Sequence, residues 1–398
     1  MSGRAPGLIA FIGTYTGASS PGSGGIHILE VSKDGRELTQ AGHTAAPAEA
    51  GYLAYAASTG TLYAVDERKT DGRGPVQAPA AVHAFAVNRQ DGSLTPLNSR
   101  PAPGPFPTFL SVSDDQRRLV TANHGSFDHV ERAVKGPDGE WTVEYVYDDS
   151  AVLVYDLEPD GRIGPLSDVK VMEGHGKDPN FSPQAGGHAQ ASPHAHCAVI
   201  DPSGHFVLVA DKGTDRIFVY RLGATLEPAF TYQFPEETGP RHISFDPATG
   251  NAFVTLEFAS ELASMAFGDQ SGELRLLDRV GTTDGHEGLN EPAEVRVHPN
   301  GRFVYVNNRG EDTLAWFGTD ENGKLTRLGH VSLAPSLHPG VAARNFTIDP
   351  SGSFMLVADR PAGLVRSYGL DNDTGALTPL TDIAVPEPAF VQFVALDG

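Results

Sequence analysis

Apolar and polar residues alternate along short segments of the chain, and the same order of segments recurs. In the clearest copy, an alternating segment from His196 ends in the turn Asp201-Pro-Ser-Gly204, and the apolar segment that follows ends at Asp211. A third segment ends at Tyr220. Alternation with a period of two is typical of half-buried β-strands, and a Pro-x-Gly turn joins antiparallel neighbours because Pro presets φ and Gly accepts positive φ. We therefore predict a repeated sheet of about four antiparallel strands.

Six full copies of this pattern lie along the chain. Their first strands start at Tyr52, Thr108, His196, Arg241, Ala293 and Arg344. The starts lie about 45 to 56 residues apart, a period typical of propeller blades, except between Thr108 and His196. We assign the excess in that interval to loop insertions near 126–147, which is charged and interrupted by Gly and Pro, and near 172–193, which is rich in Gly and His.

The two ends of the chain together supply a seventh copy. Segments 8–14, 25–31 and 38–42 match a second, third and fourth strand, but no first strand precedes them. Residues 388–394 alternate like a first strand and have no further strand after them. We predict an all-β fold, a seven-bladed β-propeller that takes residues 1–398 as one domain. Pairing of the C-terminal strand with the N-terminal blade would close the ring and remove open sheet edges.

Charge and cysteine content narrow the choice of partners. Lys and Arg number 29 against 50 Asp and Glu, a formal net charge of -21, which repels nucleic acid and anionic membrane surfaces. The apolar run 8–12 is too short for a signal-peptide core or a membrane span, so we expect a cytoplasmic protein. The single cysteine, Cys197, excludes an intramolecular disulfide.

Polar residues gather where the apolar second strands end. These end positions are Glu67, Asn123, Asp211, Glu257, Asn308 and Asp359. In an antiparallel sheet the end of one strand lies beside the start of its neighbour, so we expect these residues and the first-strand starts at one mouth of the ring. Capping of strand ends also explains the Asn and Asp members taken singly. Charged groups of both signs at this mouth favour a site for a small anion with proton transfer.

Motifs through nearly the whole chain resemble one known family. They are Phe11-Ile-Gly-Thr-Tyr-Thr16, Leu62-Tyr-Ala-Val-Asp-Glu67, Ser192-Pro-His-Ala-His196, Gly239-Pro-Arg-His242, Ala293-Glu294 before His298-Pro-Asn-Gly-Arg302, Asn308-Arg-Gly310 and Arg344-Asn-Phe. The chain is similar to the seven-bladed propeller lactonases, which include bacterial 6-phosphogluconolactonase and the fungal carboxy-cis,cis-muconate cyclizing enzyme. Asn123-His124-Gly125 departs from the usual Asn-Tyr-Gly of that family.

The resemblance implies a set of catalytic residues, and the positions at the mouth of the ring add candidates for substrate binding. The catalytic candidates are His196, Arg241, Glu257 and Arg309. The substrate-binding candidates are Arg344, His194, Glu67, Asn123, His124, Asp211, Asn308 and Asp359. Glu257 would act as general base or acid, and Arg241 and Arg309 would clamp an anionic group and stabilise an oxyanion. The competing interpretation is a Glu257–Arg241 ion pair that serves stability alone.

The leading hypothesis is a metal-independent lactonase that opens a sugar-acid lactone, with no cofactor and with a small anionic or sugar-like substrate. His175, His188, His194 and His196 lie near one another in sequence, but no H-E-x-x-H or comparable spacing is present, so a metal site ranks second. The chain also lacks a Walker or dinucleotide motif. The alternatives are a muconate-type cycloisomerase that uses the same residues, and a non-catalytic propeller that binds a ligand or a protein.

Overall fold

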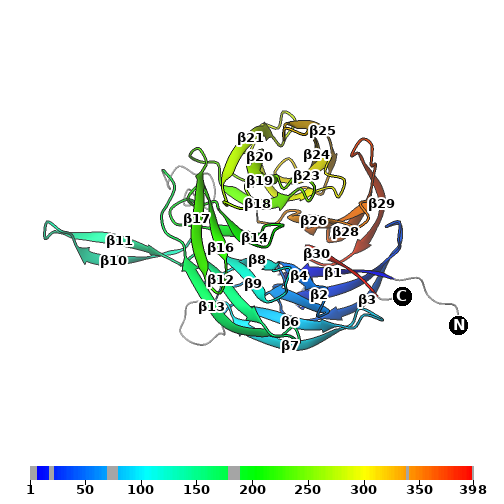
Figure 1. The fold of residues 1–398 in the computed structure, drawn as a ribbon, viewed down its shortest axis with the longest axis horizontal. Coiled ribbons are helices and arrows are strands. Elements are labelled where there is room, and N and C mark those ends of the chain that lie inside the picture. Colours follow the sequence, from blue (N-terminus) through cyan, green and yellow to red (C-terminus); the bar gives the residue numbers. More distant parts are fainter. Residues whose placement is uncertain (1–6, 18–21, 70–78, 178–188, 338–339, 397–398) are drawn as a thin grey trace.

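The computed structural model describes residues 7–17, 22–69, 79–177, 189–337 and 340–396. Within these residues the chain forms seven four-stranded antiparallel sheets around a ring, together with a separate two-stranded hairpin (Figure 1). The predicted all-β, seven-bladed propeller is confirmed.

Each blade runs from an inner strand beside the channel to an outer strand. Blade 1 holds β30 (Pro388–Ala395), β1 (Leu8–Thr14), β2 (Gly25–Val31) and β3 (Leu38–Thr44). Blade 2 holds β4 (Leu53–Ala56), β5 (Thr61–Val65), β6 (Ala81–Val87) and β7 (Leu94–Pro101). Blade 3 holds β8 (Pro107–Val112), β9 (Arg118–Asn123), β12 (Ala151–Leu157) and β13 (Ile163–Val171). Blade 4 holds β14 (Ala195–Ile200), β15 (Phe206–Asp211), β16 (Arg216–Leu222) and β17 (Leu226–Gln233).

The remaining three blades follow the same order. Blade 5 holds β18 (Pro240–Phe245), β19 (Ala252–Leu256), β20 (Glu261–Phe267) and β21 (Leu274–Gly281). Blade 6 holds β22 (Glu291–Val297), β23 (Phe303–Arg309), β24 (Thr313–Thr319) and β25 (Leu325–Ser332). Blade 7 holds β26 (Asn345–Ile348), β27 (Phe354–Asp359), β28 (Leu364–Leu370) and β29 (Leu377–Ala384), with a short 3₁₀ turn, Arg360–Ala362, after β27.

The inner strands close the ring. They contact one another in the order β30, β4, β8, β14, β18, β22, β26 and back to β30. Strand β30 pairs antiparallel with β1, with Ile9 opposite Val394, so the C-terminal strand completes the N-terminal blade as predicted. Closure by hydrogen bonds needs no covalent staple, and Cys197 is a buried free thiol.

Apolar side chains of neighbouring blades fill the space between the sheets. Strand β15 is buried along its whole length, and the ring of Phe206 packs edge-on against Phe267 of blade 5, with ring centroids 5.9 Å apart. In the turn before β15, the Asp201 carboxylate accepts a hydrogen bond from the Phe206 N–H at 2.7 Å, and Gly204 has a φ of 74°. That φ lies in the left-handed region, where glycine has no Cβ penalty, which explains why the Pro-x-Gly turn recurs.

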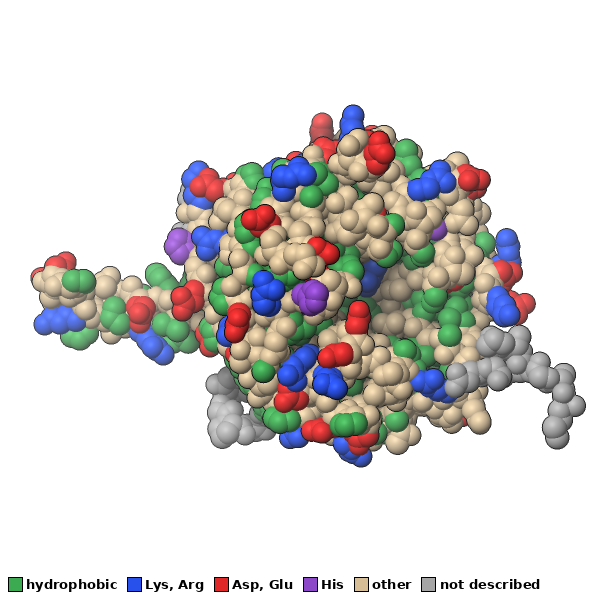
Figure 2. Space-filling view, in the orientation of Figure 1, with side chains coloured by type: hydrophobic (Ala, Val, Ile, Leu, Met, Phe, Trp, Pro, Cys, Tyr) green, Lys and Arg blue, Asp and Glu red, His purple; other side chains and the backbone are tan. Residues whose placement is uncertain are grey.

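The first insertion, 126–147, is a β-hairpin rather than the predicted loop. Strands β10 (His129–Lys135) and β11 (Trp141–Tyr147) pair only with each other and project away from the propeller (Figure 1, Figure 2). The charged residues that suggested a loop are interleaved with β-branched and aromatic residues, and Val130 and Trp141 are 61% and 72% exposed. Of the second insertion, residues 178–188 lie outside the described residues.

Candidate active site

A cavity of about 660 Å³ opens at one mouth of the ring. Its polar wall comes from blades 2 to 7 and their loops, and Phe106 and Phe127 add apolar surface. The polar lining residues are Glu67, Asp128, Thr108, Ser126, His124, His196, Lys212, Glu257, Glu291, Arg309 and Arg344. The structure therefore brings together six of the predicted site residues, which are Glu67, His124, His196, Glu257, Arg309 and Arg344.

The strand register explains which second-strand residues face this cavity. Equivalent pairs in four neighbouring blades are Asn123 opposite Pro107, Asp211 opposite Ala195, Leu256 opposite Pro240 and Asn308 opposite Pro292. The residues that come next along the chain are His124, Lys212, Glu257 and Arg309, and all four line the cavity. Successive side chains of a strand point to opposite faces, so a shift of one residue along the strand decides whether a side chain lines the cavity or is buried between the blades. The sequence alignment set Glu257 level with Asn123 and Asp211, one residue out of register.

Asn123 and Asp211 do not line the cavity but hold its supporting loops. The Asn123 side-chain amide donates hydrogen bonds to the backbone oxygens of Pro103 and Gly104, at 3.2 and 2.7 Å. The Asp211 carboxylate accepts hydrogen bonds from the backbone N–H groups of His194 and Gly213, at 2.7 and 2.9 Å. Burial raises the pKa of Asp211 to about 6. The capping role considered for these residues fits both.

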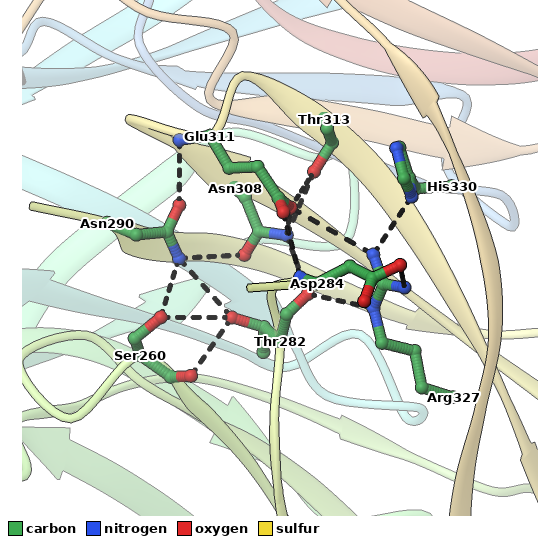
Figure 3. A network of polar contacts seen from close by, with 9 residues as sticks. All are labelled: Ser260, Thr282, Asp284, Asn290, Asn308, Glu311, Thr313, Arg327 and His330. Atoms are coloured by element: carbon green, nitrogen blue, oxygen red, sulfur yellow. Dashed lines mark hydrogen bonds and ion pairs between the residues drawn. The ribbon is translucent and has the colours of Figure 1, made fainter. Parts of the chain in front are cut away.

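Asn308 and Asp359 also lie outside the cavity wall. Asn308 belongs to a network of amide, hydroxyl and charged groups between blades 5 and 6, and it donates to the Thr282 carbonyl at 3.0 Å and to Thr313 Oγ1 at 3.1 Å (Figure 3). The Asp359 carboxylate lies 2.6 Å from Arg366 Nε and accepts a hydrogen bond from the Ala334 N–H at 3.1 Å. These contacts give the two side chains a structural role, which is to hold neighbouring strands and loops together.

The first-strand starts divide in the same way. His196, Thr108 and Arg344 line the cavity, but Tyr52 lies deeper, with its ring centroid 4.0 Å from that of Phe390. The residue level with His196 in blade 2 is instead Gly51, since Leu53 pairs with Ala64. A Cβ on Gly51 would lie 1.9 Å from Glu67 Oε2, so a side chain there would displace the Glu67 carboxylate. The prediction that all twelve positions cluster at the mouth is wrong for this reason of register.

Glu257 is the centre of a buried cluster of charges. Lys212 Nζ donates a hydrogen bond to Oε1 at 2.9 Å, and Oε2 lies 2.8 Å from Arg241 Nε and 3.1 Å from an Arg309 amino group. Burial by itself would raise the pKa of Glu257, but the three cations outweigh it and hold the pKa far below the usual range of a glutamate. Arg241 is 2% exposed and does not line the cavity. Its role is therefore to hold the Glu257 carboxylate, and it does not contact a ligand in the cavity directly.

Five polar residues at or beside the cavity escaped the sequence analysis, namely Ser126 and Asp128 of the first insertion, Lys212, Glu291 and Tyr15. Lys212 stands in Asp211-Lys-Gly213, which repeats the pattern of Asn123-His-Gly125 and Asn308-Arg-Gly310, so the repeat itself could have found it. Glu291 lies 3.4 Å from the Arg309 guanidinium, and burial raises its pKa. Tyr15 donates a hydrogen bond to Glu67 Oε2 at 2.6 Å and accepts one from Arg344 at 2.9 Å. Neither Glu291 nor Tyr15 occupies a position where the repeat marks a polar residue.

Two pairs of histidines flank the cluster. The rings of His124 and His194 stack with centroids 4.5 Å apart, and His194 Nδ1 lies 3.0 Å from the His124 carbonyl oxygen. His196 Nδ1 lies 3.1 Å from Nε2 of His242. Burial, aided by the positive charge of Arg241, lowers the pKa of His196 well below that of an ordinary histidine. His194 lies behind the wall, and burial lowers its pKa to about 3.

The arrangement offers a base and positive charge in one enclosure. A neutral imidazole can take a proton, and ammonium and guanidinium groups at low exposure can stabilise an oxyanion. Burial lowers the pKa of Lys212, but the Glu257 carboxylate opposes this shift. Within the described residues no group of three His, Cys, Asp or Glu side chains is placed to hold a metal ion, and His188 lies outside those residues. No described helix is long and apolar enough to cross a membrane.

Comparisons with known proteins agree with this fold along its whole length. The family model described as "Lactonase, 7-bladed beta-propeller" matches residues 9–393. A 6-phosphogluconolactonase of Bacillus subtilis is 29% identical over 395 residues, 97% of this chain and 98% of that protein. A 6-phosphogluconolactonase of Pectobacterium atrosepticum is 26% identical over 390 residues, 95% of this chain and 98% of that protein.

A solved structure shows the same architecture. The periplasmic gluconolactonase PpgL of Pseudomonas aeruginosa superposes with a TM-score of 0.80 and 25% identity, over 98% of this chain and all of that chain (100%). The family model spans all seven blades, from β1 to the closing strand β30. The chain belongs to the lactonase family of seven-bladed β-propellers.

Proposed function

We propose that the protein hydrolyses a sugar-acid lactone, as a 6-phosphogluconolactonase-like enzyme. The observation that carries the proposal is that the neutral imidazole of His196 faces the same cavity as Lys212 and Arg309. The cavity volume of about 660 Å³ suits a small molecule, since such sites span about 300 to 1,000 Å³. The names of the relatives, 6-phosphogluconolactonase and gluconolactonase, support this class of substrate.

In the proposed reaction, His196 takes a proton from a water molecule whose oxygen bonds to the lactone carbonyl carbon. The carbonyl oxygen becomes an oxyanion, which Lys212 and Arg309 stabilise. The protonated His196 then returns its proton to the ring oxygen as the carbon–oxygen bond breaks, and the hydroxy acid forms. Both oxygens of Glu257 contact cations, Oε1 with Lys212 and Oε2 with Arg241 and Arg309, so we assign Glu257 the task of holding these cations in place.

The test is acid release from glucono-δ-lactone and its 6-phosphate in a pH-stat, measured above the spontaneous rate. We expect turnover by the wild type and a loss of about a hundredfold or more in His196→Asn. His205→Asn, an exposed histidine in a turn of blade 4, is the matched control and should retain full activity. Equal rates for wild type and His196→Asn would contradict the proposal.

Two alternatives give different outcomes in the same experiment. A muconate-type cycloisomerase would instead consume the conjugated-diene absorbance of a muconate diacid. A non-catalytic binding propeller would bind ligand equally well after His196→Ala and Glu257→Gln. The expected cytoplasmic location stays a prediction, since the structural neighbour PpgL is described as periplasmic.

A further inference from the structure

Two motifs of the sequence, Gly239-Pro-Arg-His242 and Ala293-Glu294, each end in a side chain that does not line the cavity, His242 and Glu294. His242 and Glu294 each lie one residue deeper than Arg241 and Ala293 on the inner strands β18 and β22. Both are buried, at 4% and 2% exposure. They occupy the throat of the ring, between the cavity and a hollow of about 400 Å³ at the opposite mouth, which Glu294 also lines.

A chain of polar contacts leads from Glu294 to the cavity. Glu294 Oε1 lies 3.2 Å from His242 Nδ1, and His242 Nε2 lies 3.1 Å from His196 Nδ1. The His242 ring is fixed from the side by Phe109, edge-on with centroids 5.4 Å apart, and by Tyr52 at 6.3 Å. The other ring nitrogen of His196, Nε2, makes no hydrogen bond to any described residue, and His196 lines the cavity.

The Glu294 carboxylate is anchored as an anion. Its Oε2 accepts a hydrogen bond from the Asn345 amide at 2.6 Å and lies 3.4 Å from an Arg296 amino group. Its Oε1 also accepts a hydrogen bond from the Val295 N–H at 3.1 Å. Burial would raise the pKa of Glu294, but Arg296 and His242 outweigh it and lower the pKa to about 2. A carboxylate with these donors can only accept at the contact with His242.

The positions of the protons then follow one after another. The contact between Glu294 Oε1 and His242 Nδ1 is an ion-pair distance without hydrogen-bond geometry, but a carboxylate oxygen 3.2 Å away favours the His242 tautomer with its proton on Nδ1. A neutral His242 therefore presents a bare Nε2, and His196 must donate to it from Nδ1. Neutral His196 is left with a bare Nε2, which is the nitrogen on the cavity side. Burial lowers the pKa of His242 to about 4, in agreement with a neutral ring.

We propose that Glu294 and His242 are positioning residues that hold His196 in the tautomer with its unprotonated Nε2 toward the cavity. A carboxylate that orients an imidazole base from behind is the principle of the serine-protease triad, and here the carboxylate acts through a second imidazole. The catalytic consequence rests on the proposed lactonase function, but the tautomer does not.

The first test is spectroscopic and needs no substrate. Wild-type protein with ¹⁵N-labelled histidine is compared with His196→Asn to assign the His196 ring nitrogens. We expect the Nε2 resonance at the shift of an unprotonated nitrogen and the Nδ1 resonance at that of a protonated one, at pH 7.5. A protonated Nε2 on His196 would overturn the proposal.

The second test replaces the anchor, by Glu294→Gln. Asn345 and Arg296 both donate to Oε2, whereas the Val295 N–H donates to Oε1, so the Gln oxygen is expected to stay with the two side-chain donors. The NH₂ group then faces His242, at the cost of the Val295 hydrogen bond, and reverses every proton along the chain. His196 Nε2 should become protonated, and kcat should fall tenfold or more with KM nearly unchanged. The control is Asp349→Asn, a buried turn carboxylate that holds the Phe354 N–H, which should cost stability but leave kcat and the His196 resonances as in the wild type.

The two proposals fail separately. If the resonances follow the prediction and no lactone is hydrolysed, the proposed function fails while the positioning role stands. If Glu294→Gln retains the wild-type kcat, or leaves His196 Nε2 unprotonated, the positioning role fails whatever the substrate is. Should Glu294→Gln not fold, the wild-type resonances decide alone.

Discussion

Two polar clusters meet at Asn308 and Arg309, which are neighbours on strand β23, and the clusters are built on opposite principles. Around Asn308 the donors and acceptors are matched: the Asn290 amide donates to Ser260 Oγ at 2.8 Å and to Asn308 Oδ1 at 3.1 Å, and Asn308 donates to Thr313 and to the Thr282 carbonyl (Figure 3). Of the charged members, the Glu311 carboxylate accepts hydrogen bonds from Asn308 and Thr313, and Arg327 extends the network through ion pairs with Asp284 and Glu311 (Figure 3).

Around Glu257, by contrast, one carboxylate contacts three buried cations, Lys212, Arg241 and Arg309, and the second carboxylate nearby, Glu291, contacts only Arg309. Such an excess of one charge is costly in a low-dielectric interior, and it suits a site that must accept a developing negative charge. Asn308 and Arg309 are adjacent in sequence, so one step along a strand separates a satisfied network from a reactive one. The comparison teaches that polarity at a strand end does not identify function, whereas unbalanced charge facing a cavity does.

The largest effect is expected from Glu257→Gln, which removes the carboxylate from the unbalanced cluster. Lys212 and Arg241 then lose the carboxylate that they contact, and only Glu291, beside Arg309, remains to oppose the repulsion among the three cations, so the free energy of unfolding should fall by about 3 to 5 kcal/mol. Lactone hydrolysis should fall about a hundredfold or more, because Lys212 and Arg309 lose the group that holds them. Urea unfolding and the pH-stat assay measure the two effects.

A second variant separates charge balance from shape in that cluster. Glu257→Gln combined with Lys212→Met removes one cation along with the carboxylate, so part of the lost stability should return while activity stays low. If the single variant unfolds at the same urea concentration as the wild type, the cluster is not held by charge and the contrast with Asn308 disappears.

The matched network should respond in stability alone. Asn308→Ala removes the hydrogen bonds of Asn308 with Asn290, Thr282 and Thr313, each worth about 1 kcal/mol, so the free energy of unfolding should fall by about 2 to 3 kcal/mol. Lactone hydrolysis should stay within about twofold of the wild type, because Asn308 does not line the cavity. Asn300→Ala, in an exposed turn of the same blade, is the control, and a large loss of kcat in Asn308→Ala would show that the two clusters are coupled.

The repeat made most of the fold predictable from sequence. The Pro-x-Gly turns and alternating strands are local, and the unpaired strand 388–394 had one free edge to complete, so ring closure followed. The hairpin 129–147 was missed because its strands pair with each other and not with a blade. No hydrophobic core imposes an apolar face on it, so its alternation is weaker than that of the blades.

The site was predictable only to within one residue along each strand. Glu67, His124, His196, Glu257, Arg309 and Arg344 were placed correctly at the cavity, whereas Asn123, Asp211, Asn308 and Asp359 face away from it. Bulges near the inner-strand starts, such as the register shift between Pro240 and Ile243, decide which side chain faces inward, and no repeat pattern encodes them. The link from Glu294 to His242 joins two blades and depends on the closed ring, whereas Glu291 and Arg309 lie opposite each other on strands β22 and β23 of one blade.

The smallest effect is expected from pH, and it too distinguishes the two clusters. His194, behind the cavity wall, has a folded pKa of about 3, below the value of about 6.5 in an unfolded chain. Below pH 6.5 the unfolded chain therefore binds a proton at His194 that the folded protein does not bind, and the free energy of unfolding falls as the pH falls. From pH 7.5 to 5 this one residue should cost up to about 2 kcal/mol.

The measurement is the difference between wild type and His194→Gln in the free energy of unfolding at pH 7.5, 6 and 5. The variant should lose less stability on acidification by up to about 2 kcal/mol, because glutamine does not titrate. Asp211, whose pKa is raised to about 6, acts in the opposite direction below pH 6, but it is present in both proteins and cancels in the difference. Asn308→Ala should follow the wild-type pH dependence, since His194 is unchanged in that variant. If the free energy of unfolding of wild type and of His194→Gln changed equally with pH, His194 would bind its proton as readily in the folded protein as in the unfolded chain. The region behind the cavity wall would then tolerate a charge, and the contrast with the Asn308 network would be lost there.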